Sequence, residues 1–504
     1  MLNSIIFILK INYYTTNMST KRLYNLINGS WKSTNKYDTI INVLNGNVNH
    51  RVPSTCVSEL NPFIQSINKV PKSGLHNPFK NPERYQMLGE VCFKTAHTLH
   101  DTEVEEKIIN EIISVTGKTY DQAYKELSVS RKFLENFSGD QVRFLAKGFN
   151  TPGDHLGQMA NGFRWPLGSV AIIAPFNFPL EIPLLQLMGS LFMGNKPILK
   201  VDSKVSIVMD SILKIMHLHG LPKHDVDFIH CDGSVMEELL TNSNIRMTQF
   251  TGSTKISEKL AKALNGKIKI EDGGFDWKII GPKENDNNNI HEICNSDAYN
   301  FSGQKCSAQS MLFIHDSHDL VEFRDKLRCL SKTNIMGPIL TLTSDEMLSH
   351  VNKLLDIKGS KLWFGGNKLD HGDIPKYLGY IDPTAVYIPL DSIDDSNIDL
   401  VTKEIFGPVQ VVTSYSDINK VLDLCEKIDA QLTAAVVSNN PHFVNHVLGN
   451  TVNGTTYTGI NARTTGAPQN HWFGPCGDPR SAGIGTPEAI IQTWSCHREI
   501  IKDE

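Results

Sequence analysis

From residue 168 onward, short apolar runs alternate with longer segments that repeat apolar residues at helical spacing. The apolar runs are bounded by glycine, proline or polar residues, and their length is typical of strands buried inside a sheet. They occupy residues 169–174, 197–201, 226–230, 247–250 and 268–270. The helical segments are residues 180–193, 204–217 and 255–263. This alternation predicts an α/β fold in which helices cover both faces of a parallel sheet.

The region before this alternation has a more mixed pattern. Residues 84–147 are expected to be mainly helical, because apolar residues recur at helical spacing in 104–115 and 133–144. Proline and glycine make 71–82 a loop. The stretch 153–166 is polar and contains several glycines, so it is expected to be a connector.

A second α/β region is expected after the asparagine-rich stretch 285–289, and it extends to about residue 452. Residues 453–480 are rich in glycine, threonine, asparagine and proline. This composition predicts an ordered loop rather than a regular element.

Composition excludes several classes of protein. Of the 504 residues, 40% are hydrophobic and 20% are charged, which excludes a disordered chain. A formal net charge of -5 provides no basic surface field, so nucleic acid is not expected as a partner. No apolar run has the length of a membrane span, and no membrane partner is expected. Nine cysteines without a Cys-x-x-Cys pair indicate free thiols in a reducing compartment.

The N-terminal stretch has the composition of an import segment. Residues 1–36 contain no aspartate or glutamate, and they carry five lysine or arginine side chains among serine, threonine, asparagine and tyrosine. We therefore predict a mitochondrial targeting segment in residues 1–22 and a location in the matrix. The alternatives are a disordered tail, a start of translation at Met18, and a cytoplasmic location.

Three residues near the ends of predicted strands can carry catalytic chemistry. Cys306 lies in a loop of small residues (FSGQKCSA), where the adjacent Lys305 would favour a nucleophilic thiolate. Glu271 ends a predicted strand beside a glycine turn, which suits a general base facing a cleft. Asn177 follows another strand, and its amide can donate to an oxyanion. Taken singly, each has an ordinary alternative: an inert thiol, a surface acid and a turn-forming asparagine.

The sequence also contains a candidate phosphate site. Residues 251–254 (TGST) open a predicted helix, whose first backbone N–H groups can hold a phosphate, although a plain helix cap explains them equally well. Lys200, near a strand end, can reach a ribose or a phosphate. No metal site is expected, because the clustered histidines lack the spacing of a ligand set: His217, His219, His224 and His230.

Eight short motifs occur in order between residues 167 and 499. They are 174–179 (APFNFP), 194–200 (GNKPILK), 250–253 (FTGS), 270–274 (IEDGG), 302–307 (SGQKCS), 404–408 (EIFGP), 464–475 (TTGAPQNHWFGP) and 483–490 (GIGTPEAI). In this order they resemble the aldehyde dehydrogenase superfamily. The last two resemble, within it, the plant and protist type of pyrroline-5-carboxylate dehydrogenase.

This resemblance implies an aldehyde dehydrogenase-like α/β fold with a Rossmann-type NAD-binding domain and a second α/β catalytic domain. The implied domains are residues 23–273 for NAD, with an oligomerisation excursion near 140–165, and residues 274–460 for catalysis. Residues 461–504 would form a substrate-anchor loop and a C-terminal oligomerisation segment. A homo-oligomer is expected on the same ground.

The resemblance also implies a role for each matching residue. Cys306 is the implied nucleophile, Asn177 with the backbone N–H of Cys306 the oxyanion donor, and Glu271 the base for hydrolysis. The implied NAD-binding residues are Lys200, Ser203, Gly252, Ser253, Glu404 and Phe406. The implied anchors for the amino-acid end of the substrate are Ser307, Gly466 and Ala467.

Two departures from the family pattern bear on the cofactor. Ser257 stands where many relatives have the second glycine of the turn, which puts tight helix packing there in doubt. Ser203 stands where NAD-preferring relatives often carry a glutamate that repels a 2′-phosphate, and Lys204 is adjacent. NAD is the expected cofactor, and use of NADP stays open.

The implied reaction is the NAD-dependent oxidation of L-glutamate γ-semialdehyde, the open form of pyrroline-5-carboxylate, to L-glutamate in proline catabolism. The alternatives are oxidation of succinic or aminoadipic semialdehyde, transfer of the acyl group to coenzyme A, and a non-catalytic protein that reuses the fold. The presence of Glu271 disfavours coenzyme A transfer, because that reaction needs no hydrolytic base.

Overall fold

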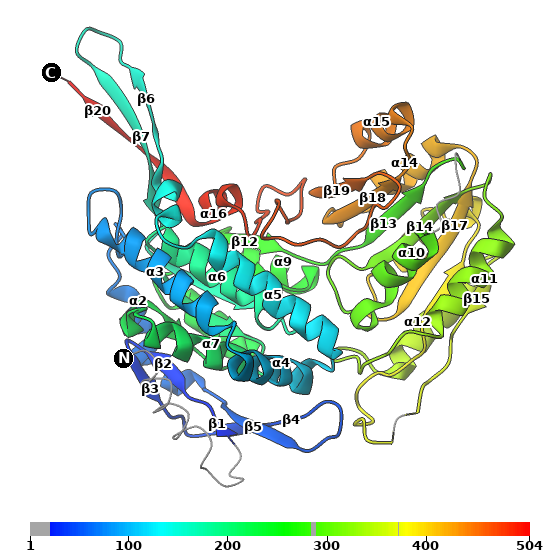
Figure 1. Ribbon diagram of the computed structural model, residues 1–504, viewed down its shortest axis with the longest axis horizontal. Coiled ribbons are helices and arrows are strands. Elements are labelled where there is room, and N and C mark those ends of the chain that lie inside the picture. Colours follow the sequence, from blue (N-terminus) through cyan, green and yellow to red (C-terminus); the bar gives the residue numbers. More distant parts are fainter. Residues whose placement is uncertain (1–20, 284–288, 371, 504) are drawn as a thin grey trace.

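The computed structural model describes residues 21–503 apart from 284–288 and 371. The predicted targeting segment, residues 1–22, therefore falls almost wholly outside the described residues. Figure 1 shows two lobes, each built around a sheet, with the C-terminal segment returning from the second lobe to the first. Within the described ranges, no helix is both long and apolar enough to cross a membrane.

The first lobe contains a seven-stranded sheet. Its strands are β2 (Asn25–Ile27), β3 (Ser30–Lys32), β8 (Ser169–Ala174), β9 (Lys196–Val201), β10 (Asp227–Phe228), β11 (Met247–Thr251) and β12 (Ile268–Glu271). The order is β12-β11-β8-β9-β10-β2-β3, and the five strands from β12 to β10 are parallel. The predicted parallel sheet is confirmed, and its carboxyl ends form one edge.

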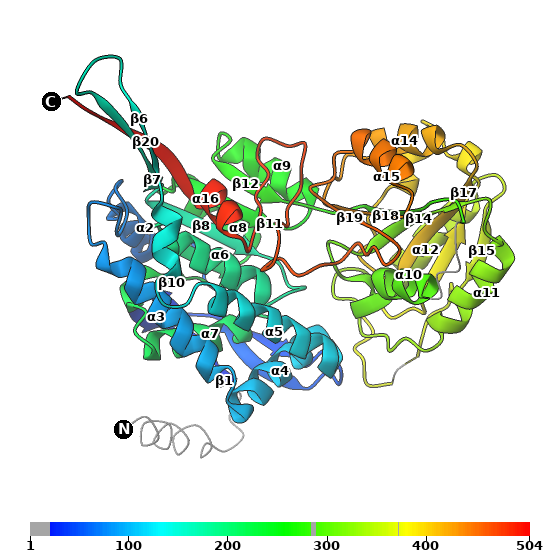
Figure 2. The ribbon, with the colours of Figure 1, turned by 45° about the horizontal axis from the view of Figure 1, so that its top comes forward.

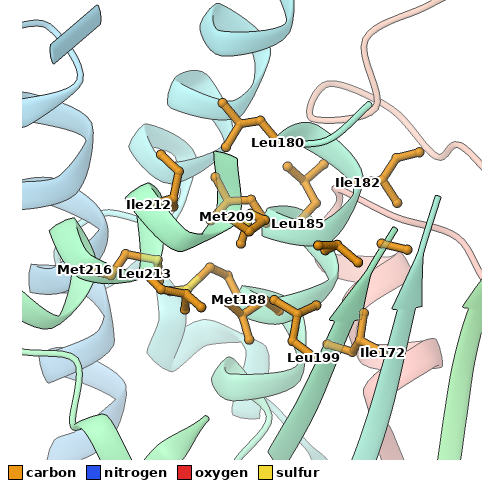
Figure 3. Close-up of a cluster of buried hydrophobic side chains, with 14 of the residues drawn as sticks. Ile172, Leu180, Ile182, Leu185, Met188, Leu199, Met209, Ile212, Leu213 and Met216 are labelled. Carbon is orange, nitrogen blue, oxygen red and sulfur yellow. The ribbon is translucent and has the colours of Figure 1, made fainter. Parts of the chain in front are cut away.

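Helices cover both faces of this sheet, as predicted. Helices α6 (Glu181–Phe192) and α7 (Ile207–Leu218) pack on one face, and α8 (Gly233–Thr241) and α9 (Thr254–Ala263) pack on the other. Figure 3 shows the core between the first pair of helices and the strands, to which Met188 of α6, Met209 of α7 and Leu199 of β9 contribute. The sequence analysis did not predict α8.

The third predicted strand is shorter than expected. It was expected over 226–230, but β10 contains only two residues. The backbone N–H of His230 donates instead to the side-chain oxygen of Asn25, at 2.9 Å, so the chain leaves the ladder before that residue.

The helical region before the sheet consists of α2 (Asn61–Asn68), α3 (Glu83–Thr98), α4 (Thr102–Thr116) and α5 (Tyr120–Asn136). The prediction of one helix over 133–144 is wrong. Helix α5 ends at Asn136, Gly139 takes a φ of 61°, and a separate 3-10 turn, η2 (Gln141–Ala146), follows. A residue with this left-handed conformation cannot belong to a continuous right-handed helix, and apolar spacing alone does not reveal it.

The predicted connector at 153–166 is also wrong. Most of it is β7 (Met159–Pro166), which pairs antiparallel with β6 (Phe149–Pro152) and with β20 (Ser495–Lys502). This three-stranded sheet projects from the first lobe, as Figures 1 and 2 both show. Its polar sequence suits strands that face solvent, and such strands lack the apolar run of a buried strand.

The second lobe contains another seven-stranded sheet, and the predicted second α/β region is confirmed. Its strands are β13 (Asp276–Ile280), β14 (Gln309–His315), β15 (Lys361–Phe364), β16 (Thr384–Tyr387), β17 (Val409–Tyr415), β18 (Thr433–Val437) and β19 (Thr455–Thr458). The order is β15-β16-β17-β14-β13-β18-β19. The surrounding helices are α10 (Ile290–Tyr299), α11 (Leu320–Ser331), α12 (Ser344–Leu355), α13 (Ile398–Val401), α14 (Ile418–Glu426) and α15 (Pro441–Gly449).

The segment 453–480 was expected to be a loop, and this is correct except for β19 at its beginning. After β19 it crosses back to the first sheet, where Ile270 and Ser481 form an isolated bridge. Helix α16 (Pro487–Trp494) and β20 complete the chain. A small sheet of β1 (Lys21–Arg22), β5 (Val48–Pro53) and β4 (Tyr37–Ile41) lies near the N-terminus, and the remaining 3-10 turns are η1 (Val57–Glu59), η3 (Lys223–Asp225), η4 (Asn300–Gly303) and η5 (Leu390–Ser392).

Candidate active site

Asn177 lies in the turn between β8 and α6, at the carboxyl edge of the first sheet. Its side chain is buried, and its Oδ1 has no hydrogen-bond partner among the described residues. The rings on both sides of it are fixed: Phe176 contacts Phe406 with centroids 5.9 Å apart, and Phe178 contacts Phe301 at 6.4 Å. Because these partners belong to two other loops, the amide is held where the three loops meet.

Cys306 follows a strained turn. Phe301 and Ser302 both have a φ of 54°, which is costly for residues with a side chain and concentrates at functional sites. The hydroxyl of Ser302 bonds to the backbone of 337–340, and so does the side-chain amide of Gln304, at 2.8 to 3.1 Å. These bonds hold the turn in place, and the half-buried thiol follows directly.

The thiol of Cys306 interacts with the carboxylate of Glu271 at the end of β12. Both carboxylate oxygens are buried, and no described residue meets them with aligned hydrogen-bond geometry. Burial raises the pKa of Glu271 to about 7, and the thiol offsets part of this shift. A carboxylate with this pKa can accept a proton near neutral pH.

The state of the thiol differs from the sequence prediction. Burial raises the pKa of Cys306 well above its usual range, and the negative charges of Glu271 and Asp276 add to this shift. Burial lowers the pKa of Lys305 to about 8, and Lys305 is not among the main influences on the pKa of Cys306, which burial and the carboxylates dominate. The prediction that Lys305 favours a resting thiolate is therefore wrong, and the proton stays on sulfur until a base removes it.

The candidate phosphate site lies at the start of α9. Ser253 is the N-cap of this helix, and its side chain makes no capping hydrogen bond. The N–H of Gly252 donates to the carbonyl of Glu271 at 3.1 Å, which ties the turn to the end of β12. The positive end of the helix dipole therefore faces the same sheet edge as Glu271, which favours an anionic ligand.

Ser257 does not loosen this turn. It is buried, and its hydroxyl donates to the carbonyl of Thr254 at 2.8 Å and to Asp272 Oδ2 at 3.2 Å. The serine thus links α9 to the end of β12 where many relatives have glycine. The doubt about helix packing is removed, because α9 is regular from Thr254 to Ala263.

The lysines after β9 differ in their partners. Lys200 lies in β9, and its charge lowers the pKa of buried His230 after the neighbouring strand. Ser203 is half-buried in the following turn. The ammonium of Lys204 donates to the carbonyl of Leu340 at 3.3 Å, so it is already engaged with another loop.

Glu404 and Phe406, from the loop before β17, contact the segment after β12 and the turn after β8, respectively. Glu404 Oε1 accepts a hydrogen bond from the N–H of Gly274 at 3.2 Å, and burial raises the pKa of Glu404 to about 8. A Cβ atom at Gly274 would lie 2.0 Å from the carbonyl oxygen of Cys306, so only glycine permits this approach. Phe406 has a φ of 51°, which turns its ring toward Phe176.

The predicted substrate anchors lie on two separate segments. Ser307 is buried directly after the candidate nucleophile, whereas Gly466 is exposed and Ala467 is half-buried in the crossing segment. A Cβ atom at Gly466 would lie 1.8 Å from the hydroxyl of Tyr457, which requires glycine there. No hydrogen bond joins Ser307 to Gly466 or Ala467 among the described residues.

A buried ion pair between β13 and α10 contacts the crossing segment. Asp297 pairs with Lys278 at 2.7 Å, and its carboxylate also accepts the backbone N–H of Thr464 at 2.9 Å. Its charge raises the pKa of Lys305 as well. Asp297 thus lies between the crossing segment and the cysteine loop.

Comparison with known proteins identifies the family. The family model described as "Aldehyde dehydrogenase family" matches residues 80–488, which is most of the chain. The chain belongs to the aldehyde dehydrogenase family. The crystal structure of methylmalonate-semialdehyde dehydrogenase from Oceanimonas doudoroffii superimposes on 96% of this chain and 99% of its own, with a TM-score of 0.82 and 17% identity. The predicted fold class is confirmed.

Two relatives resemble this aldehyde dehydrogenase at the level of sequence. The mitochondrial delta-1-pyrroline-5-carboxylate dehydrogenase 12A1 of Arabidopsis thaliana is 53% identical over 486 residues, which cover 95% of this chain and 87% of its own. A 1-pyrroline-5-carboxylate dehydrogenase of Bacillus cytotoxicus is 30% identical over 376 residues, 70% of each chain.

The structure of this aldehyde dehydrogenase also reveals acidic residues that the sequence analysis did not select. Asp276 is buried near Cys306 and accepts hydrogen bonds from the backbone and hydroxyl of Thr433, at 2.6 and 2.8 Å. Glu181 begins α6, four residues after Asn177. Asp276 is the first residue of β13 and Glu181 is the first residue of α6, so neither ends a strand, which was the signal that selected Glu271.

Proposed function

We propose that this aldehyde dehydrogenase oxidises L-glutamate γ-semialdehyde, the open form of pyrroline-5-carboxylate, to L-glutamate in proline catabolism, with NAD as cofactor. The observation that carries the reaction type is the interaction of the Cys306 thiol with the Glu271 carboxylate beside the unpaired amide of Asn177. The 53% identity to the Arabidopsis enzyme supports the choice of substrate.

The reaction begins with a proton transfer. Glu271, with a pKa of about 7, takes the proton from the Cys306 thiol, and the thiolate attacks the aldehyde carbon. The carbonyl oxygen becomes an oxyanion that accepts hydrogen bonds from the amide of Asn177 and from the backbone N–H of Cys306. One such donor typically contributes about 2.7–4 kcal/mol to the lowering of the barrier.

The described residues fit a dinucleotide. The start of α9, with Gly252 and Ser253, suits the pyrophosphate, and the buried Glu404 carboxylate suits the hydroxyls of a ribose. Lys200 and Ser203 would lie at the adenine-side ribose, and Phe406 would pack near the nicotinamide. When bound, NAD supplies the acceptor for the hydride that leaves the former aldehyde carbon. The engagement of Lys204 with Leu340 supports NAD rather than NADP.

Hydrolysis of the cysteine thioester completes the reaction. Glu271 first releases the proton that it took from Cys306 to solvent. It then accepts a proton from water as the water oxygen attacks the thioester carbon, and L-glutamate leaves as the C–S bond breaks and Cys306 is regenerated. Ser307 and the backbone N–H groups of Gly466 and Ala467 hold the substrate carboxylate, since an aldehyde group alone carries little information for selection.

We also propose the division of the chain that the resemblance implies. Residues 23–273 bind the dinucleotide, residues 274–460 carry the nucleophile, and residues 461–504 contain the substrate anchor and an oligomerisation segment. The unpaired outer edge of β20 supports pairing with a second copy of the chain. A mitochondrial location is supported by the composition of residues 1–36 and by the name of the Arabidopsis relative.

A substrate panel with the purified protein tests the function. Initial rates of NADH formation are compared for pyrroline-5-carboxylate, succinic semialdehyde and aminoadipic semialdehyde, with NAD and then NADP. The highest kcat/KM is expected for pyrroline-5-carboxylate with NAD. A higher value for either other aldehyde overturns the substrate assignment, and acyl-coenzyme A as the main product when coenzyme A is added overturns the hydrolytic mechanism.

A further inference from the structure

The proposed substrate carries a charge that the proposed anchors do not match. L-glutamate γ-semialdehyde has an α-carboxylate and an α-ammonium group. Ser307, Gly466 and Ala467 offer a hydroxyl and backbone N–H groups, which suit the carboxylate. An ammonium group entering a water-poor site requires an acceptor, preferably a carboxylate.

Most of the buried carboxylates around the site are already occupied. Asp297 accepts from Lys278 and Thr464, and Asp276 accepts from Thr433 through Oδ1, while its fully buried Oδ2 has no hydrogen-bond partner among the described residues. The remaining acids are occupied as well: Glu404 accepts from Gly274, Asp272 from Ser257, and Glu126 from Lys118 and from the backbone N–H groups that follow Pro179. Glu271 is reserved for proton transfer.

The carboxylate of Glu181 differs from these acids in its contacts and in its burial. It makes no hydrogen bond or ion pair among the residues that the structure describes, and the residue is only half-buried, so the carboxylate remains reachable. The negative charge of Glu271 contributes to the raised pKa of Glu181, so the two carboxylates interact electrostatically. It is the first residue of α6, after the turn that carries Asn177.

The backbone at Glu181 is held by the buried side chain of Glu126. Its N–H donates to Glu126 Oε1 at 3.2 Å, and Glu126 pairs with the buried ammonium of Lys118 at 2.6 Å. That ammonium lies 3.9 Å from the ring centroid of Phe178 and 4.6 Å from that of Phe301. The first turn of α6 is therefore tied to the turn that precedes Cys306.

We propose that Glu181 is the specificity-determining residue that binds the α-ammonium group of the amino-acid substrate. This inference rests on the proposed function. It assigns a binding partner to the α-ammonium group, for which the anchor residues offer no acceptor. The carboxylate at the start of α6 and the neutral donors of the anchor loop would then select together for an amino acid with a terminal aldehyde.

The charges around Glu181 agree with this role. The groups that act on it are Glu126 and Glu271, which are negative, and Lys118, which is positive. Burial and the two glutamates raise the pKa of Glu181 to about 8. An arriving ammonium group favours the ionised carboxylate, so substrate binding is expected to release a proton near neutral pH.

Two aldehydes that differ only in the ammonium group provide the test. L-glutamate γ-semialdehyde and glutarate semialdehyde share chain length, aldehyde and terminal carboxylate. In Glu181→Gln, kcat/KM for the amino-acid substrate is expected to fall about 10-fold to 100-fold, mainly through KM, because a hydrogen bond to a charged group is lost. The value for glutarate semialdehyde is expected to stay within about threefold or to rise.

Glu83→Gln is the matched control, because Glu83 is the first residue of α3 and its side chain is exposed. It is expected to leave both values unchanged. An equal loss for both aldehydes in Glu181→Gln, or no loss for either, overturns the assignment of Glu181. If the unmodified enzyme does not turn over the amino-acid substrate, the proposed function is overturned instead. In that case L-glutamate and glutarate are compared as competitive inhibitors, in the unmodified enzyme and in Glu181→Gln, which shows whether Glu181 distinguishes the ammonium group.

Discussion

The carboxylate of Glu271 and the thiol of Cys306 shift each other's pKa in opposite directions. The thiol lowers the pKa of the glutamate that burial has raised, and the glutamate raises the pKa of the thiol. In the resting enzyme the proton therefore stays on the sulfur of Cys306, and Glu271 is available as a base. Cys306 is therefore activated when a base removes its proton, and it is not a thiolate in the resting enzyme.

Replacing this base is expected to separate the two halves of the reaction. In Glu271→Gln, the thiol loses its base but also a negative charge that raises its pKa, so the thiol can lose its proton to solvent and the sulfur can still attack, at a reduced rate. Hydrolysis loses its proton acceptor and should slow about 100-fold or more. Stopped-flow measurement should show a burst of NADH close to one per active site, followed by a slow steady rate. Unchanged steady turnover would remove Glu271 from the mechanism.

The pH dependence of hydrolysis should follow the same carboxylate. Glu271 acts as a base only when ionised, and its pKa is about 7. The single-turnover rate of thioester hydrolysis should therefore rise about tenfold per pH unit below pH 7 and level off above it. Glu271→Gln should lack this dependence. A rate that is flat between pH 5.5 and about 7 would contradict the assignment of the base.

The amide of Asn177 should matter only when charge develops on the substrate oxygen. Asn177→Ala is expected to lower kcat about 10²-fold to 10³-fold, with little effect on NAD binding. The measurement combines steady-state kinetics with a fluorescence titration of NAD. A change confined to KM would show that the amide does not serve the oxyanion.

Burial of Glu271 should also cost stability, with a definite sign. The pKa of this group rises from 4.5 to about 7 on folding, so the folded state binds the proton more tightly. Stability is therefore lost as pH rises from 4.5 toward 7, by about 3 kcal/mol in total.

Glu271→Gln carries no such charge, so its advantage in the free energy of unfolding should grow across that pH range and then stay constant. Urea denaturation of both proteins at pH 5 and about pH 8 measures the difference. An advantage that is equal at both pH values would show that Glu271 is not a buried ionisable group.

Strand ends were the informative feature of the sequence. The buried strands β8 and β12 are visible as apolar runs, and because parallel strands end at one edge, Asn177 and Glu271 could be expected to meet. The sequence could not reveal the exposed strand β7, because its polar residues face solvent and give no apolar run. Nor could it reveal the left-handed Gly139 that ends a continuous helical pattern.

Electrostatic effects were harder to predict than position. Sequence adjacency suggested that Lys305 would ionise Cys306, but burial and the carboxylates of Glu271 and Asp276 outweigh it. Asp276 and Glu181 were missed for a related reason. Their importance depends on which groups surround each carboxylate, and that information exists only in the three-dimensional structure.

The central claim is that the sulfur of Cys306 forms the bond to the aldehyde carbon. The most direct test is NADH formation from pyrroline-5-carboxylate by Cys306→Ala, with Cys329→Ala as the control because Cys329 is also a free cysteine and is exposed. Turnover by Cys306→Ala is expected to fall at least about 10⁴-fold while NAD still binds, and the control should match the unmodified enzyme. Turnover by Cys306→Ala within about tenfold of the unmodified enzyme would contradict the account.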